Sequence, residues 1–218
     1  FALVADYTNN LIRKIIISTI EVSTLAGSTS GSTNGIGTNA QFNAPSGINF
    51  ASDQSYVIVA DWSNHQIRKI MTSTTQVSVL VGGSTSGNSN GIGTLAQFNN
   101  PNSAVFSPDG TYVFVADNGN NLIRKVILST LEVTTFAGTG SGLTNGIGTN
   151  ALFNKPADIS FSFDGTYVLI ADMNNAQIRK MIISTLEVTT IAGNGKRGLV
   201  DGIGTNTRFF NPKGISIS

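Results

Sequence analysis

The sequence predicts an all-β fold made of four copies of one unit of roughly 55 residues. The phrase VADNGNNLIRKVILSTLEVTTFAG, which starts at Val115, recurs with small changes from Val4, Val59 and Ile170. Val, Ile, Tyr, Phe and Thr dominate each copy, and no stretch sustains the period of an amphipathic helix. A fixed period of this size indicates a modular array. The repeated aspartates mark the step: Asp6, Asp61, Asp117 and Asp172.

Each unit is expected to contain four short strands. The first follows a proline (PSGINF from Pro45), the second is the YVFVAD run from Tyr112, the third contains Ile-Arg-Lys, and the fourth is the EVTTFAG type. In the second strand, Phe114 and Ala116 face one way and Val113 faces the other, so both faces are apolar. A strand that is apolar on both faces must be covered on both. Four-stranded sheets stacked around an axis meet that need, which predicts the blades of a β-propeller.

We expect one propeller domain over residues 1-218, with one blade split between the two ends of the sequence. The predicted blade segments are 1-27, 45-83, 101-138, 156-193 and 212-218. Long inter-blade loops are predicted at 28-44, 84-100, 139-155 and 194-211. The last segment has the pattern of a first strand and the N-terminal segment that of a second. It therefore either closes the ring, joins another molecule or continues into further blades. The residues that would form this joint are Phe1, Leu3, Ala5, Ile215 and Ile217.

The repeat resembles the NHL-repeat family of β-propellers over essentially the whole chain. The resemblance rests on Pro-Ser-Gly-Ile from Pro45, Tyr-Val-Phe-Val-Ala-Asp from Tyr112, Asn-His-Gln-Ile-Arg-Lys-Ile from Asn64, and the spacer from Asn34 to Pro45. It implies the propeller fold, but such propellers serve as RNA readers, protein-binding platforms, lyases and structural modules. The family often has Arg before the Ile of the third strand. Here that position holds other residues, so no role of that Arg carries over: Leu11, Gln66, Leu122 and Gln177.

Charged residues are few, at 11% of the chain with a net charge of +1. The Asp, Arg and Lys of the repeat account for 12 of the 25 charged residues, and because buried charges are normally paired, we expect structural contacts between its Asp and Arg side chains. These repeated charges are Asp6, Arg13, Asp61, Arg68, Asp117, Arg124, Asp172 and Arg179. No nucleic acid partner is expected, since a positive surplus and regularly placed aromatic residues are both lacking.

No catalytic, metal or cofactor site is predicted. The chain has no cysteine, and one histidine, His65, cannot form a multi-histidine metal centre. The Asn-Gly and Asp-Gly pairs at Asn34, Asn90, Asn145 and Asp201 are interpreted as tight turns, because both residue types tolerate a positive φ. No apolar run has the roughly 20 residues of a membrane span.

The sequence therefore predicts a non-catalytic, extracellular or cell-surface propeller that self-assembles into a fibre or surface layer. Near-identical blades offer near-identical surfaces, which favours repetitive assembly. Its partner is expected to be the chain itself or another protein, and O-linked glycans are an option on the Ser- and Thr-rich loops. The alternatives are a protein- or glycan-binding module of a larger protein and, less favoured, a propeller lyase or hydrolase or an RNA-binding domain.

Overall fold

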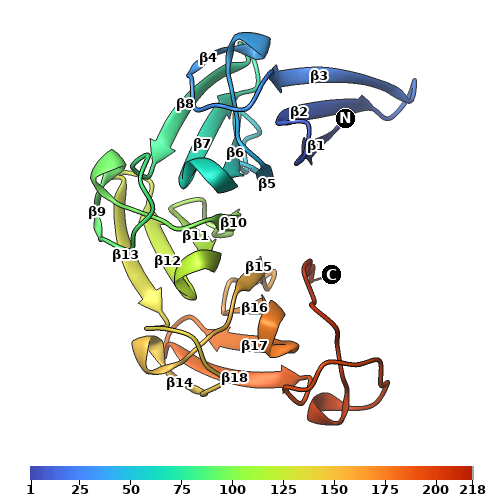
Figure 1. Ribbon diagram of the computed structural model, residues 1–218, viewed down its shortest axis with the longest axis vertical. Helices are drawn as coiled ribbons and strands as arrows, with labels where there is room; N and C mark the ends of the chain where they lie inside the picture. The colour runs from blue at the N-terminus through green and yellow to red at the C-terminus, as the bar shows by residue number, and fades with distance from the viewer. Residues whose placement is uncertain (218) are drawn as a thin grey trace.

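The computed structural model describes residues 1–217 as blades arranged side by side in an open arc (Figure 1). Ser218, the last residue of the expected domain, lies outside the described residues. Three blades are five-stranded antiparallel sheets, and the N-terminal blade has three strands. Blade 1 consists of β1 (Ala2–Asp6), β2 (Leu11–Ile16) and β3 (Glu21–Gly27).

The other blades keep the four strands predicted from the repeat, in the predicted order. Blade 2 has β5 (Pro45–Phe50), β6 (Tyr56–Asp61), β7 (Gln66–Met71) and β8 (Gln76–Val81). Blade 3 has β10 (Pro101–Phe106), β11 (Tyr112–Asp117), β12 (Leu122–Ile127) and β13 (Glu132–Ala137). Blade 4 has β15 (Pro156–Phe161), β16 (Tyr167–Asp172), β17 (Gln177–Ile182) and β18 (Glu187–Ala192).

The inter-blade linkers are ordered and add to the sheets. Each of the first three contributes a two-residue strand to the outer edge of the blade that follows it: β4 (Gly35–Ile36), β9 (Gly91–Ile92) and β14 (Gly146–Ile147). A 3-10 turn follows in all four linkers: η1 (Gly37–Asn39), η3 (Gly93–Leu95), η5 (Gly148–Asn150) and η7 (Gly204–Asn206). Three further 3-10 turns join the second and third strands of blades 2 to 4: η2 (Trp62–Asn64), η4 (Asn118–Asn120) and η6 (Met173–Asn175).

The tight turn predicted at the Asn-Gly pairs is wrong. Gly35 lies in β4, and neither it nor Asn34 has a positive φ. The chain reverses two residues later at Gly37, whose φ is +56°. The side chain of Asn34 instead accepts a hydrogen bond from the Arg68 guanidinium at 2.7 Å.

The hydrophobic core lies between blades. In β11, Val113 and Val115 pack toward blade 2, whereas Phe114 and Ala116 pack toward blade 4, and all four are fully buried. A linker aromatic residue completes each interface: Phe42 between blades 1 and 2, Phe98 between blades 2 and 3, and Phe153 between blades 3 and 4. The structure thus confirms the argument that the second strand is covered on both faces.

The two ends of the arc do not meet (Figure 1). Of the outcomes that the sequence left open, closure within one molecule does not occur, because β1 pairs only with β2 among the described residues. Residues 213–217 form no strand, and the amide of Ile215 donates to Asp158 Oδ2 at 3.0 Å. No helix within residues 1–217 is long and apolar enough to cross a membrane.

Candidate functional site

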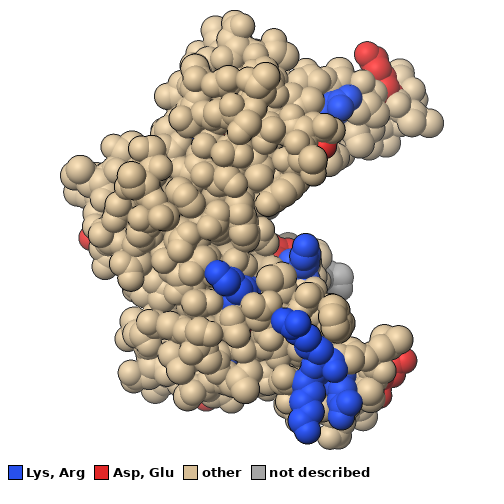
Figure 2. Space-filling view, in the orientation of Figure 1, with Lys and Arg blue, Asp and Glu red and all other residues tan. Residues whose placement is uncertain are grey.

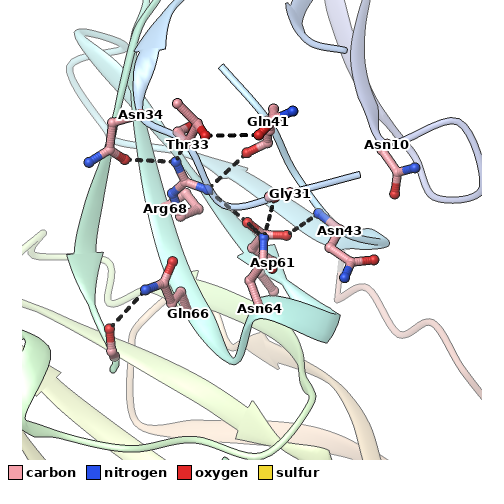
Figure 3. A network of polar contacts seen from close by, with 12 residues as sticks. Asn10, Gly31, Thr33, Asn34, Gln41, Asn43, Asp61, Asn64, Gln66 and Arg68 are labelled. Carbon is pink, nitrogen blue, oxygen red and sulfur yellow. Dashed lines mark hydrogen bonds and ion pairs between the residues drawn. The ribbon is translucent and has the colours of Figure 1, made fainter. Parts of the chain in front are cut away.

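The repeated charges of blade 2 form a buried cluster that holds the preceding linker (Figure 3). Arg68 and Asp61 have no exposed side-chain surface, and the guanidinium donates from Nη1 to Asp61 Oδ2 at 2.9 Å. The same guanidinium donates to the carbonyl of Gln41 at 3.0 Å, to that of Thr33 at 3.3 Å and to Asn34 Oδ1 at 2.7 Å. Each of these acceptors belongs to the linker.

Both oxygens of the Asp61 carboxylate also accept hydrogen bonds. Its Oδ1 accepts the backbone N–H of Asn43, and its Oδ2 accepts the side chain of Asn64, both at 2.8 Å. Asn64 also donates to the carbonyl of Gly31 at 2.7 Å. The cluster therefore fixes both the start and the end of the linker onto the blade.

Blades 3 and 4 repeat this geometry almost atom for atom. Arg124 lies 3.1 Å from Asp117, and Arg179 lies 2.9 Å from Asp172, in both cases with fully buried side chains. Their guanidinium groups donate to the matching linker acceptors at 2.8 to 3.1 Å: Gln97 O, Ser89 O and Asn90 Oδ1 in blade 3, and Leu152 O, Thr144 O and Asn145 Oδ1 in blade 4.

Blade 1 has the same residues in a different state. Arg13 and Asp6 lie 3.6 Å apart, with side-chain exposures of 31% and 27%. Asn9 donates to both oxygens of Asp6 at 3.0 Å. Within the described residues no linker occupies this cluster, so the same side chains are open to solvent.

Burial dominates the electrostatics of the occupied clusters. It raises the pKa of Asp61 and Asp172, and it raises the pKa of Asp117 to about 6, even though Asn and Arg side chains and a backbone N–H stabilise each carboxylate. Burial likewise lowers the pKa of Arg124. Both oxygens of each carboxylate accept hydrogen bonds from the protein: Oδ1 from a linker amide, and Oδ2 from an Asn and an Arg side chain.

The lysines next to these arginines point to the other face of the sheet. Their ammonium groups lie over tyrosine rings at 4.1 to 4.3 Å: Lys69 over Tyr56, Lys125 over Tyr112 and Lys180 over Tyr167. Figure 2 shows a surface with few charges, apart from Lys and Arg gathered at the C-terminal end of the arc. The fourth linker and the residues just after it contain four basic residues: Lys196, Arg197, Arg208 and Lys213.

His65 has a structural position. Its Nδ1 accepts the backbone N–H of Asn100 at 3.1 Å, and burial lowers its pKa, so the neutral form is favoured. Asn10 and Asn121 accept the matching linker amides, those of Ala44 and Lys155, at 2.8 Å. His65 therefore does in blade 2 what an asparagine does in its neighbours.

The remaining carboxylates are dispersed. Asp53, Asp109 and Asp164 close turns by accepting hydrogen bonds from serine, threonine and backbone groups, which lowers their pKa values. Asp158 lies on the inner strand β15 and accepts the hydroxyl of Ser103 at 2.6 Å. Within residues 1–217, no three histidine, cysteine or acidic residues come together as a metal site would require.

A polar groove follows the inner strands β5, β10 and β15. Gly47, Ser103, Asp158 and Ser160 line it, together with Ile215 from the C-terminal segment. The expected joint residues lie apart: Phe1, Leu3 and Ala5 are at the edge of blade 1, whereas Ile215 and Ile217 lie against β15. The sequence did not reveal that the linkers are the ligands of the Asp–Arg clusters, because the contacts are made largely by backbone carbonyls.

No family model matches the chain. Among curated proteins, it is 31% identical over 163 residues to NHL repeat-containing protein 2 of Homo sapiens, an alignment that covers 70% of this chain and 22% of that protein. The Bos taurus protein of the same name is 31% identical over 176 residues, covering 75% of this chain and 24% of that protein. The chloroplastic protein SUPPRESSOR OF QUENCHING 1 of Arabidopsis thaliana is 28% identical over 229 residues, an alignment that covers 99% of this chain and 22% of that protein.

The chain thus spans less than a quarter of the length of these curated relatives. Solved structures share the fold at low identity. A protein of unknown function from Bacteroides thetaiotaomicron superposes with a TM-score of 0.67 at 18% identity, covering 99% of this chain and 61% of that one. An auxiliary nutrient binding protein from Bacteroides ovatus gives 0.69 at 17% identity, covering 98% and 49%. With its repeated blades, the constant spacing of Asp and Arg in its four repeats and these relatives, the chain belongs to the NHL-repeat family of β-propellers.

Proposed function

We propose that this chain is a non-catalytic propeller that acts as an interaction and assembly module outside the cell. One observation carries the proposal. The repeated polar groups are used inside the fold to hold linkers, whereas large apolar side chains are exposed, and ten of the seventeen within the described residues lie in blade 1 or in the fourth linker. Large apolar patches on a surface mark sites of association. At one end these are Val4, Tyr7 and Val22, and at the other Leu199, Ile203 and Phe210.

The proposal that the chain is not a catalyst is supported by the hydrogen bonds that its titratable side chains already make within the protein. The Asp–Arg clusters are closed by their linkers, and His65 accepts a backbone amide. An acid–base catalyst needs a titratable group within reach of a substrate. Asp158, the carboxylate on the inner groove, already accepts a hydroxyl and two amides: Ser103 Oγ, Ile159 N and Ile215 N.

The surface composition supports an extracellular or cell-surface setting. Charged residues make up 11% of the chain, and the first linker exposes a run of hydroxyl side chains that includes Ser28, Thr29, Ser30 and Thr33. Such a surface is hydrated without many charges and offers acceptors for O-linked glycans. A fibre or surface layer is the assembly that we propose, because identical units joined head to tail propagate when the contact does not close on itself.

The experiment is sedimentation velocity and negative-stain electron microscopy of the unmodified chain over a concentration series. Assembly predicts a sedimentation coefficient that rises with concentration, and filaments or sheets with a regular repeat. A species that stays monomeric up to millimolar concentration would refute the proposal. The control is an Ile36→Ser variant, which should sediment like the unmodified chain, because Ile36 is exposed in a linker away from both ends of the arc.

A second candidate is a binding module for a small polar ligand or glycan. The inner groove favours it, since hydroxyl, carboxyl and main-chain groups of Gly47, Ser103, Asp158 and Ser160 line one concave surface. Two solved propellers of this shape bear the name auxiliary nutrient binding protein. Binding in a glycan array that is lost in Asp158→Asn, with the assembly state unchanged, would favour this function over assembly.

A further inference from the structure

The last two residues of the second linker are bound by two different blades. The backbone N–H of Asn99 donates to Asp117 Oδ1 of blade 3 at 2.8 Å, and the carbonyl of Asn99 accepts the Gly119 amide of the same blade at 2.7 Å. The backbone N–H of Asn100 donates instead to His65 Nδ1 of blade 2 at 3.1 Å. Adjacent peptide groups thus tie the end of this linker to opposite sides of the seam between blades 2 and 3.

The seams on either side contain the same bond with a different acceptor. Asn10 Oδ1 accepts the Ala44 amide between blades 1 and 2, and Asn121 Oδ1 accepts the Lys155 amide between blades 3 and 4, both at 2.8 Å. A side-chain amide oxygen accepts a hydrogen bond at any pH. Since His65 is the only histidine of the chain, the seam between blades 2 and 3 is the one of these three that relies on an imidazole, a group that titrates near neutral pH.

An imidazole nitrogen accepts a hydrogen bond only while it carries no proton. Neutral His65 accepts through Nδ1 and carries its proton on the other nitrogen, whereas in the imidazolium both nitrogens are donors. Protonation of Nδ1 would place its N–H against the N–H of Asn100, so the hydrogen bond must break. Acid therefore takes away the acceptor that holds the end of the linker on blade 2.

We propose that the seam between blades 2 and 3 is a pH-sensitive joint, which protonation of His65 loosens by releasing the end of the second linker from blade 2. The inference goes beyond the proposed function and does not depend on it, because every group involved lies inside one chain. The change should stay local. Phe98, two residues before Asn100, remains fully buried in the apolar interface of the two blades, and Asn99 remains bound to blade 3.

Burial favours the neutral form of His65. It lowers the pKa of the imidazole, so the folded protein takes up this proton less readily than the unfolded chain does. The contribution of the hydrogen bond to stability is therefore complete above the pKa of an unperturbed histidine. It is lost as pH falls from there through the lower pKa of the folded state.

The charged groups around the joint are few and have partners of their own. The elements beside it that carry no charged residue are η2, β5, β8, residues 84–100, β10 and η4. The charged side chains of β6, β7, β11 and β12 are Asp61 with Arg68, Asp117 with Arg124, and Lys69 and Lys125, whose ammonium groups lie over tyrosine rings. Because burial raises the pKa of Asp117 to about 6, its titration has to be separated from that of His65.

Two variants fix the joint in its two states. His65→Asn supplies an acceptor at every pH, and His65→Ala supplies none. Both should fold, because His65 has a φ of +59° and the residues at the same place in the other blades adopt nearly the same backbone: Asn10 at +60°, Asn121 at +61° and Ala176 at +51°. Asp117 is present in both variants and in the natural chain, so its titration is common to all three proteins.

The measurement is hydrogen exchange of the Asn100 amide, followed by NMR at about pH 7.5 and about pH 5. Exchange is expressed as a protection factor, which removes the intrinsic effect of pH on the exchange rate. The natural chain should match His65→Asn at the higher pH and approach His65→Ala at the lower pH, with a fall in protection of about fivefold or more. The Lys155 amide, which Asn121 binds, is the internal control and should be protected equally in all three proteins at each pH.

A natural chain that matches His65→Asn at both pH values, or His65→Ala at both, would overturn the joint. Equal losses of protection at Asn100 and Lys155 would overturn it too, since acid would then act on every seam alike. A ¹⁵N titration of the single imidazole gives an independent readout. Nδ1 should be the unprotonated nitrogen at neutral pH, and the midpoint should lie below that of an unperturbed histidine; a neutral form with its proton on Nδ1 would also overturn the joint.

Discussion

The occupied and open versions of one cluster allow a matched test of what holds the linkers. In Arg124→Met, the guanidinium is lost from a site where it is fully buried. Asp117 then keeps a buried charge without its partner, and Gln97 O, Ser89 O and Asn90 Oδ1 lose a donor. Breaking a buried pair by removing one member costs about 3–5 kcal/mol.

The same change at Arg13 provides the control. That guanidinium lies 3.6 Å from Asp6, and both side chains are about a quarter to a third exposed. Arg13→Met in the monomer should therefore cost about 0–1 kcal/mol. The difference between the two variants isolates the effect of burial and of the linker, because residue type and position within the blade are the same.

Hydrogen exchange by mass spectrometry is the suitable assay, because repeat arrays need not unfold in one step. Peptides from residues 84–100 should exchange on the order of a hundred-fold to several thousand-fold faster in Arg124→Met, since each 1.4 kcal/mol is a factor of about ten. The effect should be smaller at pH 5 than at pH 7, because the isolated Asp117 carboxyl can then take up a proton. If Arg124→Met and Arg13→Met lowered the stability equally, or if exchange in residues 84–100 were unchanged, the inference that the Asp–Arg cluster holds the linker would be refuted.

Three further outcomes are expected. His65→Asn should keep the stability of the wild type, whereas His65→Ala should lose about 0.5–1.5 kcal/mol in urea unfolding, because only asparagine can accept the Asn100 amide; equal loss in both would contradict the role of His65. Phe98→Ala should cost about 3–5 kcal/mol by the same assay, since the ring is fully buried between blades 2 and 3, and a loss below 1 kcal/mol would show that the interface rests elsewhere. In carboxyl ¹³C titrations, Asp117 should titrate near pH 6, whereas the pKa values of Asp109 and Asp164 should be lower than that of an unperturbed aspartate. By linkage, the raised pKa of Asp117 stabilises the folded state at low pH, and this contribution to the free energy of unfolding is lost as pH rises toward 6. The lowered pKa values of Asp109 and Asp164 stabilise the folded state above about pH 4, and their contribution is lost in acid. Stability should therefore peak at roughly pH 4–5, and a monotonic rise to pH 8 would contradict these assignments.

The fold could be predicted from the sequence because the repeat makes each local pattern appear several times. The apolar residues on both faces of the Tyr112–Asp117 strand required cover on two sides, and the structure supplies it from neighbouring blades. Four strands per blade followed from the same period. The fifth strand could not be foreseen, since two residues such as Gly35–Ile36 give no periodic signal.

The polar clusters were harder to predict for a physical reason. The sequence indicated that the charges would be paired, but half of the acceptors of Arg68 are backbone carbonyls, which any residue supplies. Asn34 was misread as a turn residue because Asn-Gly suits both roles. A side-chain amide recurs three residues after a glycine, as from Gly31 to Asn34 and from Gly142 to Asn145, with Asp201 as the one exception, and this spacing is the signal that could have been used.

The way each linker straddles two blades also bears on how the gene could gain or lose repeats. A linker follows one blade but is bound by the Asp–Arg cluster of the next blade. The natural unit of duplication is therefore a linker together with the blade that follows it. Excision of one period between Gly82 and Gly138 would place the linker at 139–155 directly after blade 2. The linker would still be followed by the cluster that binds it, which contains Asp172 and Arg179. Copy number could then change by recombination between repeats without creating a mismatched junction.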